Sequence, residues 1–142
     1  MLTDKEKTLW NRLSVFSGGW TPEAAEDICT DEKVRRSDIA ELHEALAEKS
    51  IIILNKEKTR YRMLESIKQF GAQKLKEEED DPESISDRHF IYYTELATAE
   101  DEKLKGDKIV HGLKILDTEN SNIVKALERS IKSYRFSEAA KL

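Results

Sequence analysis

A change of hydrophobic period within residues 60–71 is the feature that most constrains the fold. Up to Leu64 the apolar residues Tyr61 and Met63 alternate with arginines, which is typical of a half-buried strand. Beyond that point the apolar positions recur at helical spacing, at Leu64, Ile67, Phe70 or Gly71, and Leu75. The sequence therefore predicts a strand that leads directly into a helix.

The residues before this stretch supply a partner for the strand. Residues 51–54 are four consecutive apolar side chains, and the polar residues 55–59 that follow favour a turn. The sequence thus predicts a small β-hairpin near residues 51–64 and a helix from Glu65 to about Glu78.

Two helices at the start of the chain are marked by residues that favour helix N-termini. Thr3 and Glu6 have the spacing of a capping box, and the helix that they begin is predicted to stop at the glycine pair 18–19. Thr21 precedes Pro22, which favours the beginning of a second helix. The apolar stripe of the first helix consists of Leu9, Trp10, Leu13 and Phe16.

A third helix is predicted after the charged loop 31–36, with Ser37 as its N-cap. Its apolar face is formed by Ile39, Leu42, Ala45 and Leu46. Its opposite face holds the acidic side chains Asp38, Glu41, Glu44 and Glu48. We therefore expect this helix to have an acidic outer surface.

Short helices followed by a β-hairpin are typical of a winged helix-turn-helix domain, which we assign to residues 1–80. The acidic run 77–81 and Pro82 mark its end, through charge repulsion and the restricted backbone before proline. Residues 83–142 are predicted to form an antiparallel helical segment. The expected fold class is thus mainly α, with one small β-hairpin.

The helical pattern of the second half has several parts. One helix is predicted from about Ser84 to Gly106, and a further pattern follows, with a break near residues 120–122. Ser137 would cap another helix, but the sequence ends at Leu142, too soon for such a helix to bury a face. We therefore expect the chain to be a piece of a longer protein in which the helical array continues.

Composition argues against several classes of protein. The net charge of −5 is opposite to a domain-wide nucleic-acid footprint, although a local basic patch is compatible with it. The single cysteine, Cys29, cannot form an intrachain disulfide and is expected to be a buried, small apolar residue of a cytoplasmic protein. No apolar run approaches the roughly 20 residues of a membrane span, and the N-terminus lacks a signal sequence.

The sequence contains no catalytic or metal-binding motif. His43, His89 and His111 have no Cys, His or carboxylate partner at metal-site spacing, so surface or packing roles are predicted. No nucleophile lies beside a base and no glycine-rich phosphate loop is present, so we expect that the chain is not an enzyme. The run 77–81 is interpreted as a solvated helix end, with cation binding as the alternative. Three aromatic residues at helical spacing are assigned to the core rather than to base stacking: Phe90, Tyr92 and Tyr93.

The predicted hairpin raises the question of DNA binding. Its turn and second strand carry a basic strip formed by Lys56, Lys58, Arg60 and Arg62. Such a strip could touch phosphates, but the acidic third helix would oppose docking in the major groove, where a recognition helix must present donors. The alternative is that the basic strip faces another domain or a nucleotide phosphate.

Five segments carry a resemblance to a known family: 12–29, 42–53, 61–71, 88–93 and 116–127. The first three, in order, resemble the winged-helix domain of bacterial and archaeal STAND ATPases. These are signal-transduction ATPases with numerous domains, many of them transcriptional regulators of the LuxR or related type. In them this domain follows an NB-ARC-like nucleotide-binding module. The last two segments are similar to the linker helices that lead into tetratricopeptide-like sensor repeats.

The resemblance implies a switch motif. In related NB-ARC proteins, such as plant resistance proteins, a Met-His-Asp motif after the hairpin holds the ADP state closed, and its counterpart here is Met63, Leu64 and Glu65. Leu64 has no donor for a phosphate, whereas Glu65 could cap the next helix. The alternative is a buried Met-Leu pair that fastens the hairpin to the helix. Glu119 and Asn122 match the linker motif and are expected to fix helix packing.

Together these expectations favour a regulatory module that couples an ATPase module to helical repeats of the same parent protein. The parent is expected to bind ATP or ADP, whereas no cofactor is expected in this chain. Two alternatives remain, a DNA-binding domain that uses the basic strip and a scaffold that pairs with other helices.

Overall fold

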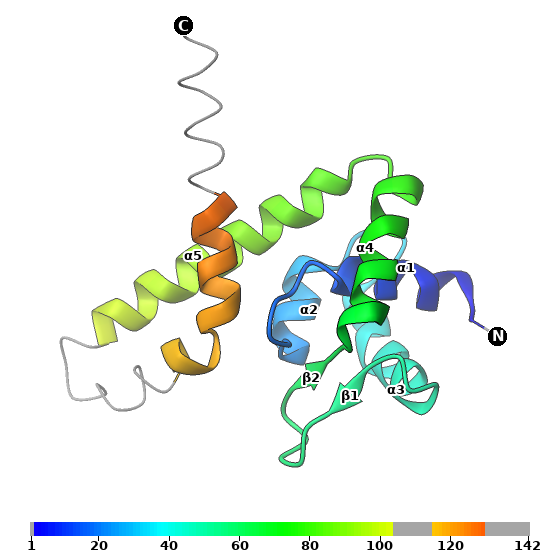
Figure 1. The fold of residues 1–142 in the computed structure, drawn as a ribbon, viewed down its shortest axis with the longest axis horizontal. Helices are drawn as coiled ribbons and strands as arrows, with labels where there is room; N and C mark the ends of the chain where they lie inside the picture. The colour runs from blue at the N-terminus through cyan, green and yellow to red at the C-terminus, as the bar shows by residue number, and fades with distance from the viewer. Residues whose placement is uncertain (1, 104–114, 130–142) are drawn as a thin grey trace, which may run out of the picture. The chain divides into compact units, whose positions relative to one another are not determined.

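The structure is a computed structural model that describes residues 2–103 and 115–129 (Figure 1). It forms two compact units, Met1–Arg88 and His89–Leu142, and each is described here by itself. The fold is mainly helical with one small two-stranded antiparallel sheet, so the predicted fold class is confirmed. The predicted end of the first domain at residue 80 lies between α4 and the next helix, which begins at Pro82, and the predicted domain limits stay a prediction.

The first helix, α1 (Asp4–Leu13), begins as predicted but ends earlier. Thr3 Oγ1 accepts a hydrogen bond from the backbone N–H of Glu6 at 3.2 Å. The Glu6 carboxylate also accepts a hydrogen bond from Lys49 Nζ at 2.5 Å, which ties the first turn of α1 to a residue far along the chain. The predicted stop at the glycine pair is wrong, because the helix closes at Ser14, whose hydroxyl donates to the Asn11 carbonyl at 2.5 Å.

The second and third helices form the next part of the first unit. Thr21 caps α2 (Pro22–Ile28) as predicted, since its Oγ1 accepts from the Ala24 N–H at 3.2 Å. The predicted cap of α3 (Ile39–Glu48) is wrong. Ser37 lies inside a short 3₁₀ turn, η1 (Arg36–Asp38), in which the Asp38 carboxylate accepts from the Arg35 N–H at 3.1 Å.

The predicted hairpin is present, with strands shorter than expected. β1 (Ile53–Leu54) pairs antiparallel with β2 (Tyr61–Arg62). The turn is closed by Asn55, whose Oδ1 accepts from the backbone N–H groups of Thr59 and Arg60 at 2.9 and 3.1 Å. A side chain that bonds the turn backbone in this way fixes the register of the two strands.

A third extended segment pairs with the hairpin, and the sequence analysis missed it. Trp20 and Tyr61 exchange two backbone hydrogen bonds, each 2.9 Å long. Residues that follow α1 in the chain therefore extend the two-stranded sheet on the side of β2.

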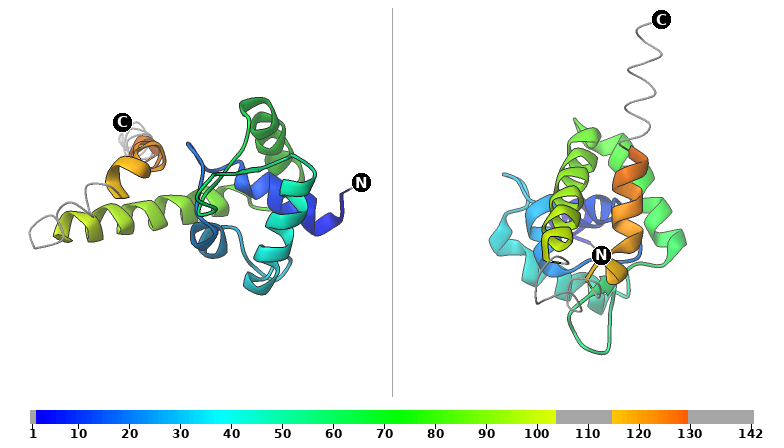
Figure 2. Two further views of the ribbon diagram at one scale, coloured as in Figure 1. Left: turned by 90° about the horizontal axis from the view of Figure 1, so that it is seen from below. Right: turned by 90° about the vertical axis from the view of Figure 1, so that its left-hand side faces the viewer.

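The core of this unit lies between its helices, and α1 packs against α4 (Glu65–Glu78), whose bounds agree with the prediction (Figure 2). On the predicted apolar face of α4, Gly71 and Leu75 are buried, whereas Phe70 is 49% exposed. Of the alternatives Phe70 and Gly71, it is therefore Gly71 that lies on the buried face of α4 together with Leu75. The largest fully buried side chains of the unit are Trp20, Arg12, Phe16, Leu9, Leu13, Ile28, Ile39, Leu46, Ile52 and His43.

In the second unit, α5 (Pro82–Lys103), which begins in the first unit, carries the fully buried Tyr93. Phe90 and Tyr92 are only half-buried, so of the three aromatic residues assigned to the core Tyr93 alone is fully buried. Residues 115–129 are helical except for a turn at Glu119, close to the predicted break. Four predicted features lie outside the described residues: the helix end at Gly106, the pattern over residues 107–114, His111 and the cap at Ser137.

Candidate interaction site at the hairpin and the third helix

A buried hydrogen-bond chain ties the hairpin region to α3. Trp20 Nε1 donates to His43 Nε2 at 3.0 Å, and His43 Nδ1 lies 2.9 Å from the Ile39 carbonyl oxygen. Since an indole nitrogen can only donate and a carbonyl can only accept, His43 must be neutral with its proton on Nδ1. Burial lowers the pKa of His43 and favours the same state. His43 is thus a packing histidine, one of the two roles predicted for it.

Ring stacking extends this chain into the hairpin. The Tyr61 ring stacks on His43 with a centroid distance of 4.5 Å and on Trp20 with one of 6.3 Å. Because Tyr61 also pairs with Trp20 through the backbone, strand β2 is fixed to α3 by both main chain and side chains. A displacement of the hairpin must therefore disturb α3.

Gly19 permits this arrangement. Its φ is +93°, a conformation that glycine adopts readily, and a Cβ at this position would lie 2.6 Å from the Tyr61 carbonyl oxygen. The glycine pair predicted as a helix stop thus has another role, which is to let the chain approach β2 closely.

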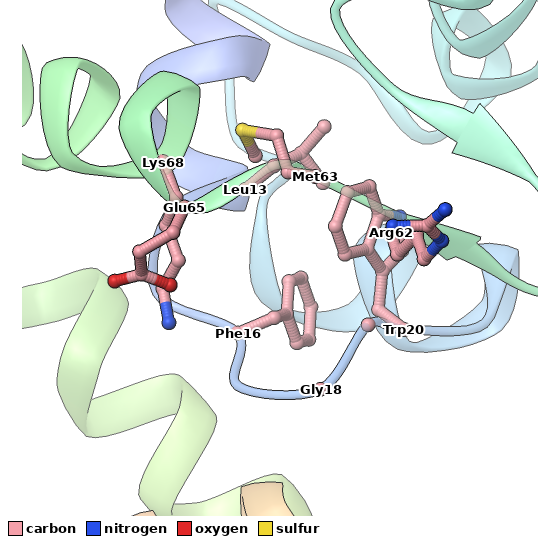
Figure 3. A pocket seen from close by; sticks show the side chains of 9 residues that line it. Leu13, Phe16, Gly18, Trp20, Arg62, Met63, Glu65 and Lys68 are labelled. Carbon is pink, nitrogen blue, oxygen red and sulfur yellow. The ribbon is translucent and has the colours of Figure 1, made fainter.

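A pocket of about 250 Å³ opens between this glycine loop and the start of α4 (Figure 3). Phe16 and Trp20 lie side by side in it. Glu65 and Lys68 project from α4 on one side, and Arg62 lies on the other (Figure 3). The pocket therefore combines an apolar floor with charges of both signs. It brings together Arg62 of the predicted basic strip with Met63 and Glu65 of the predicted switch motif.

The middle residue of the predicted motif behaves differently. Leu64 is the N-cap residue of α4, makes no capping hydrogen bond with its side chain, and is 48% exposed. The alternative of a buried Met-Leu pair is therefore wrong for Leu64. Glu65 is the first residue of α4 rather than its cap, and its carboxylate lies in the first turn, where the helix dipole favours negative charge. The switch role of Met63, Leu64 and Glu65 stays a prediction.

The basic strip does not form one continuous surface. Lys56 and Lys58 are exposed in the turn of the hairpin, whereas Arg60 Nη2 donates to the Gly18 carbonyl at 3.2 Å and Arg62 borders the pocket. Lys56 and Lys58 are thus the two lysines of the strip, and they lie exposed at the tip of the hairpin with Glu57 between them.

The acidic surface predicted for α3 is present. Glu41, Glu44 and Glu48 are exposed, spaced three and four residues apart on one side of the helix. Asp38, just before the helix, is half-buried and accepts a hydrogen bond from Lys5 Nζ at 3.1 Å. These three exposed glutamates, the α3 acidic face, occupy the helix that precedes the hairpin, where a winged-helix protein would carry its base-reading side chains.

A buried arginine clamp was missed by the sequence analysis. Arg12, which is 1% exposed, forms a bidentate salt bridge to Asp31 at 2.8 and 3.0 Å and donates to Glu79 Oε1 at 2.8 Å and to the Cys29 carbonyl at 3.0 Å. One side chain thereby joins α1, the loop after α2 and the end of α4. The sequence feature that could have predicted the clamp is the position of Arg12, three residues after Leu9 and hence on the buried face of α1.

The acidic run is exposed at Glu77, Glu78, Asp80 and Asp81, as a solvated helix end requires, and the clamp corrects that interpretation only at Glu79. Glu78 Oε2 accepts from Asn11 Nδ2 at 3.2 Å, and the Glu79 side chain is only 14% exposed. The end of α4 is therefore fastened to α1. Near the clamp, Cys29 is fully buried as predicted, and burial raises the pKa of its thiol to about 12, so the thiolate is disfavoured.

The predicted linker residues lie in the second unit. His89 Nε2 and Asn122 Oδ1 are 3.1 Å apart, and Asn122 Nδ2 donates to Glu119 Oε1 at 3.3 Å. All three side chains are buried, which is the arrangement that a packing role would require. Their assignment to a linker motif stays a prediction.

Metal-binding clusters and membrane-spanning helices are both absent from residues 2–103 and 115–129. That part of the chain contains no group of three or more His, Cys, Asp or Glu side chains that could hold a metal ion. None of its helices is both long and apolar enough to cross a membrane.

Known proteins similar to this chain were found by sequence comparison. Two proteins of Mycobacterium tuberculosis and one of Mycobacterium bovis are each 28% identical to it over 101 residues, and all three carry the provisional name of HTH-type transcriptional regulator. The match covers 70% of this chain but only 11% of each relative. No family model matches the chain, and no solved structure matches it.

Proposed function

We propose that this chain is a regulatory module of a transcriptional regulator and that it acts through contacts with protein segments rather than by reading DNA bases. The names of the mycobacterial relatives support a link to transcription. Those names describe proteins far longer than the matched segment, so they do not assign DNA reading to it.

The observation that carries the proposal is the α3 acidic face. Glu41, Glu44 and Glu48 are exposed on the helix that would have to enter the major groove, and each would be repelled by the phosphates that line it. The same helix is fixed to the hairpin through His43, Trp20 and Tyr61. The two elements therefore move together, which suits a module that transmits a change of position.

A second candidate function, DNA binding through the hairpin, is favoured by one observation. Lys56 and Lys58 are exposed at the hairpin turn, where they could contact phosphates without base readout. Binding of this kind would be independent of DNA sequence and would weaken steeply as salt rises.

A fluorescence anisotropy titration of a labelled DNA duplex at low salt separates the two candidates. We expect no salt-sensitive binding by the wild-type chain. Binding that falls steeply with salt and is lost in the variant K56A/K58A would establish the second candidate and overturn the first.

In finer terms, we propose that the module couples a nucleotide-binding module to helical repeats in a cytoplasmic STAND-type ATPase, as the resemblance implies. In this proposal the chain is not an enzyme and holds no cofactor of its own, and the parent protein binds ATP or ADP. The pocket at Met63 and Glu65 supports it, because a partner domain could contact the hairpin and α4 there at once.

The coupling is tested by adding this chain to the ATPase module that the proposal expects in the same parent protein and measuring ADP release. We expect the chain to slow release, as a closed state would. Release that is the same with and without the chain would contradict the coupling.

A further inference from the structure

A second groove, of about 340 Å³, lies between α1 and α4 and shares no residue with the hairpin pocket. Its floor is aromatic. Trp10 and Phe70 stack with a centroid distance of 5.1 Å, and the Phe70 side chain is 49% exposed. Large aromatic side chains left open on a surface are typical of the central residues of protein interfaces.

The aromatic floor is rigid. Trp10 Nε1 donates to the Ile67 carbonyl at 3.1 Å, which fixes the plane of the indole. Gly71 lies against the same edge of the ring, since a Cβ there would be 3.1 Å from both Trp10 Cδ1 and Nε1. A partner that covers Phe70 would therefore bind a preformed surface and lose little free energy to ordering it.

The groove is flanked by positive charge in a chain whose net charge is −5. Lys7 borders it on α1, and Lys74 Nζ lies 5.6 Å from the Phe70 ring centroid. Lys74 Nζ also lies 3.6 Å from a carboxylate oxygen of Glu77, in an exposed pair that a partner carboxylate can replace at small cost. The carboxylate of Glu78 is turned to the Asn11 amide.

We propose that this aromatic groove docks an acidic peptide segment that carries one large apolar side chain. The apolar side chain covers Trp10 and Phe70, and carboxylates on either side of it meet Lys7 and Lys74. The proposal rests on α1 and α4 alone, so it stands or falls independently of whether α3 or the hairpin contacts DNA.

The test uses the 142-residue chain and a synthetic peptide with one phenylalanine between glutamates, followed by two-dimensional ¹⁵N NMR. The chain has 2 tryptophans, so its indole signals report on two places at once. We expect the peptide to shift the indole signal of Trp10 and to leave that of the buried Trp20 unchanged. No shift of the Trp10 signal at millimolar peptide would overturn the proposal.

Charge-reversed variants test the role of the lysines. K7E/K74E should bind the peptide at least fivefold more weakly, whereas K56E/K58E, which changes the net charge equally at the hairpin turn, should bind as the wild type does. An unchanged Trp20 signal shows that each variant is folded. Equal weakening in both variants, or equal binding of a peptide with lysines in place of the glutamates, would show that the groove does not select an acidic partner.

Discussion

At the scale of single residues, the neutral His43 is the point on which the hairpin and α3 depend together. Its Nε2 must accept from Trp20 while its Nδ1 donates to the Ile39 carbonyl, so a second proton has no place in the folded chain. Protonation would break the Trp20 hydrogen bond in a buried site, where the lost partner is costly.

This predicts how stability depends on pH. The pKa of His43 is lowered in the folded state from its ordinary 6.5, so the unfolded state binds more protons below that pH. The contribution is complete above about pH 6.5 and is lost as pH falls, by at most about 1.4 kcal/mol per pH unit for one proton. Urea unfolding at about pH 7.5, 6.5 and 5.5 should show a steeper loss for the wild type than for H43Q. Parallel losses in the two proteins would contradict the assignment.

A substitution of Gly19 is also expected to destabilise the folded chain. Alanine there would face both an unfavourable φ of +93° and a contact of 2.6 Å with the Tyr61 carbonyl, so G19A should lose about 2 kcal/mol or more of the free energy of unfolding. G18A is the comparison, since Gly18 also has a positive φ, of 76°. Urea denaturation of both variants measures the difference. A smaller loss at Gly19 than at Gly18 would show that the close approach to β2 is unimportant.

At the scale of elements, the Arg12 clamp makes three segments of the first unit depend on one side chain. Arg12→Met keeps the size of the side chain but leaves the partly buried Asp31 and Glu79 without their cation. We expect a loss of about 3 kcal/mol in the free energy of unfolding, at the lower end of the range for a buried pair because Asp31 is 34% exposed. R36A, which removes exposed salt bridges to Glu26 and Asp27, is the control and should lose much less. Chemical denaturation that gives equal losses would refute the clamp.

The same clamp sets the response to acid. Burial alone would raise the pKa of Asp31, but the hydrogen bonds from Arg12 and from the backbone of Lys33 and Val34 outweigh it and lower the pKa to about 2 from 3.8. The stabilisation is therefore complete above about pH 5 and is lost as pH falls from about 4 to about 2. In urea unfolding over this window, the wild type should lose more stability than D31N. If D31N loses as much, Asp31 does not carry the acid response.

Local patterns predicted most helices of the first unit, and the hairpin, because caps and hydrophobic periods act within a few residues. Thr3, Thr21 and the period change at Leu64 set the starts of α1, α2 and α4 where they were expected. The pairing of Trp20 with Tyr61 and the clamp from Arg12 to Asp31 and Glu79 join residues far apart in sequence. Spacing alone contains no such information. Of the candidate site, the α3 acidic face was predictable from helical periodicity, whereas the pocket was not, since its loop required the Trp20 pairing.

At the scale of the molecule, charge is distributed by element rather than evenly. The α3 acidic face lies on the helix before the hairpin, two lysines lie at the hairpin turn, and two more flank the aromatic groove between α1 and α4. This separation supports a module that presents different surfaces to different partners. The acidic charge of α3 can be removed without a change in the core, so its effect on DNA binding can be measured by itself.

The most direct measurement is DNA binding by the variant E41Q/E44Q/E48Q, followed by fluorescence anisotropy from about 50 to about 200 mM salt. The control E32Q/E95Q/E128Q removes the same charge from exposed glutamates elsewhere. We predict no measurable binding by the wild type or the control, and salt-sensitive binding by the α3 variant, because repulsion by the α3 acidic face is what prevents contact. Salt-sensitive binding by the wild type, unchanged when the three glutamates are neutralised, would contradict the claim that the α3 acidic face keeps this module from binding DNA.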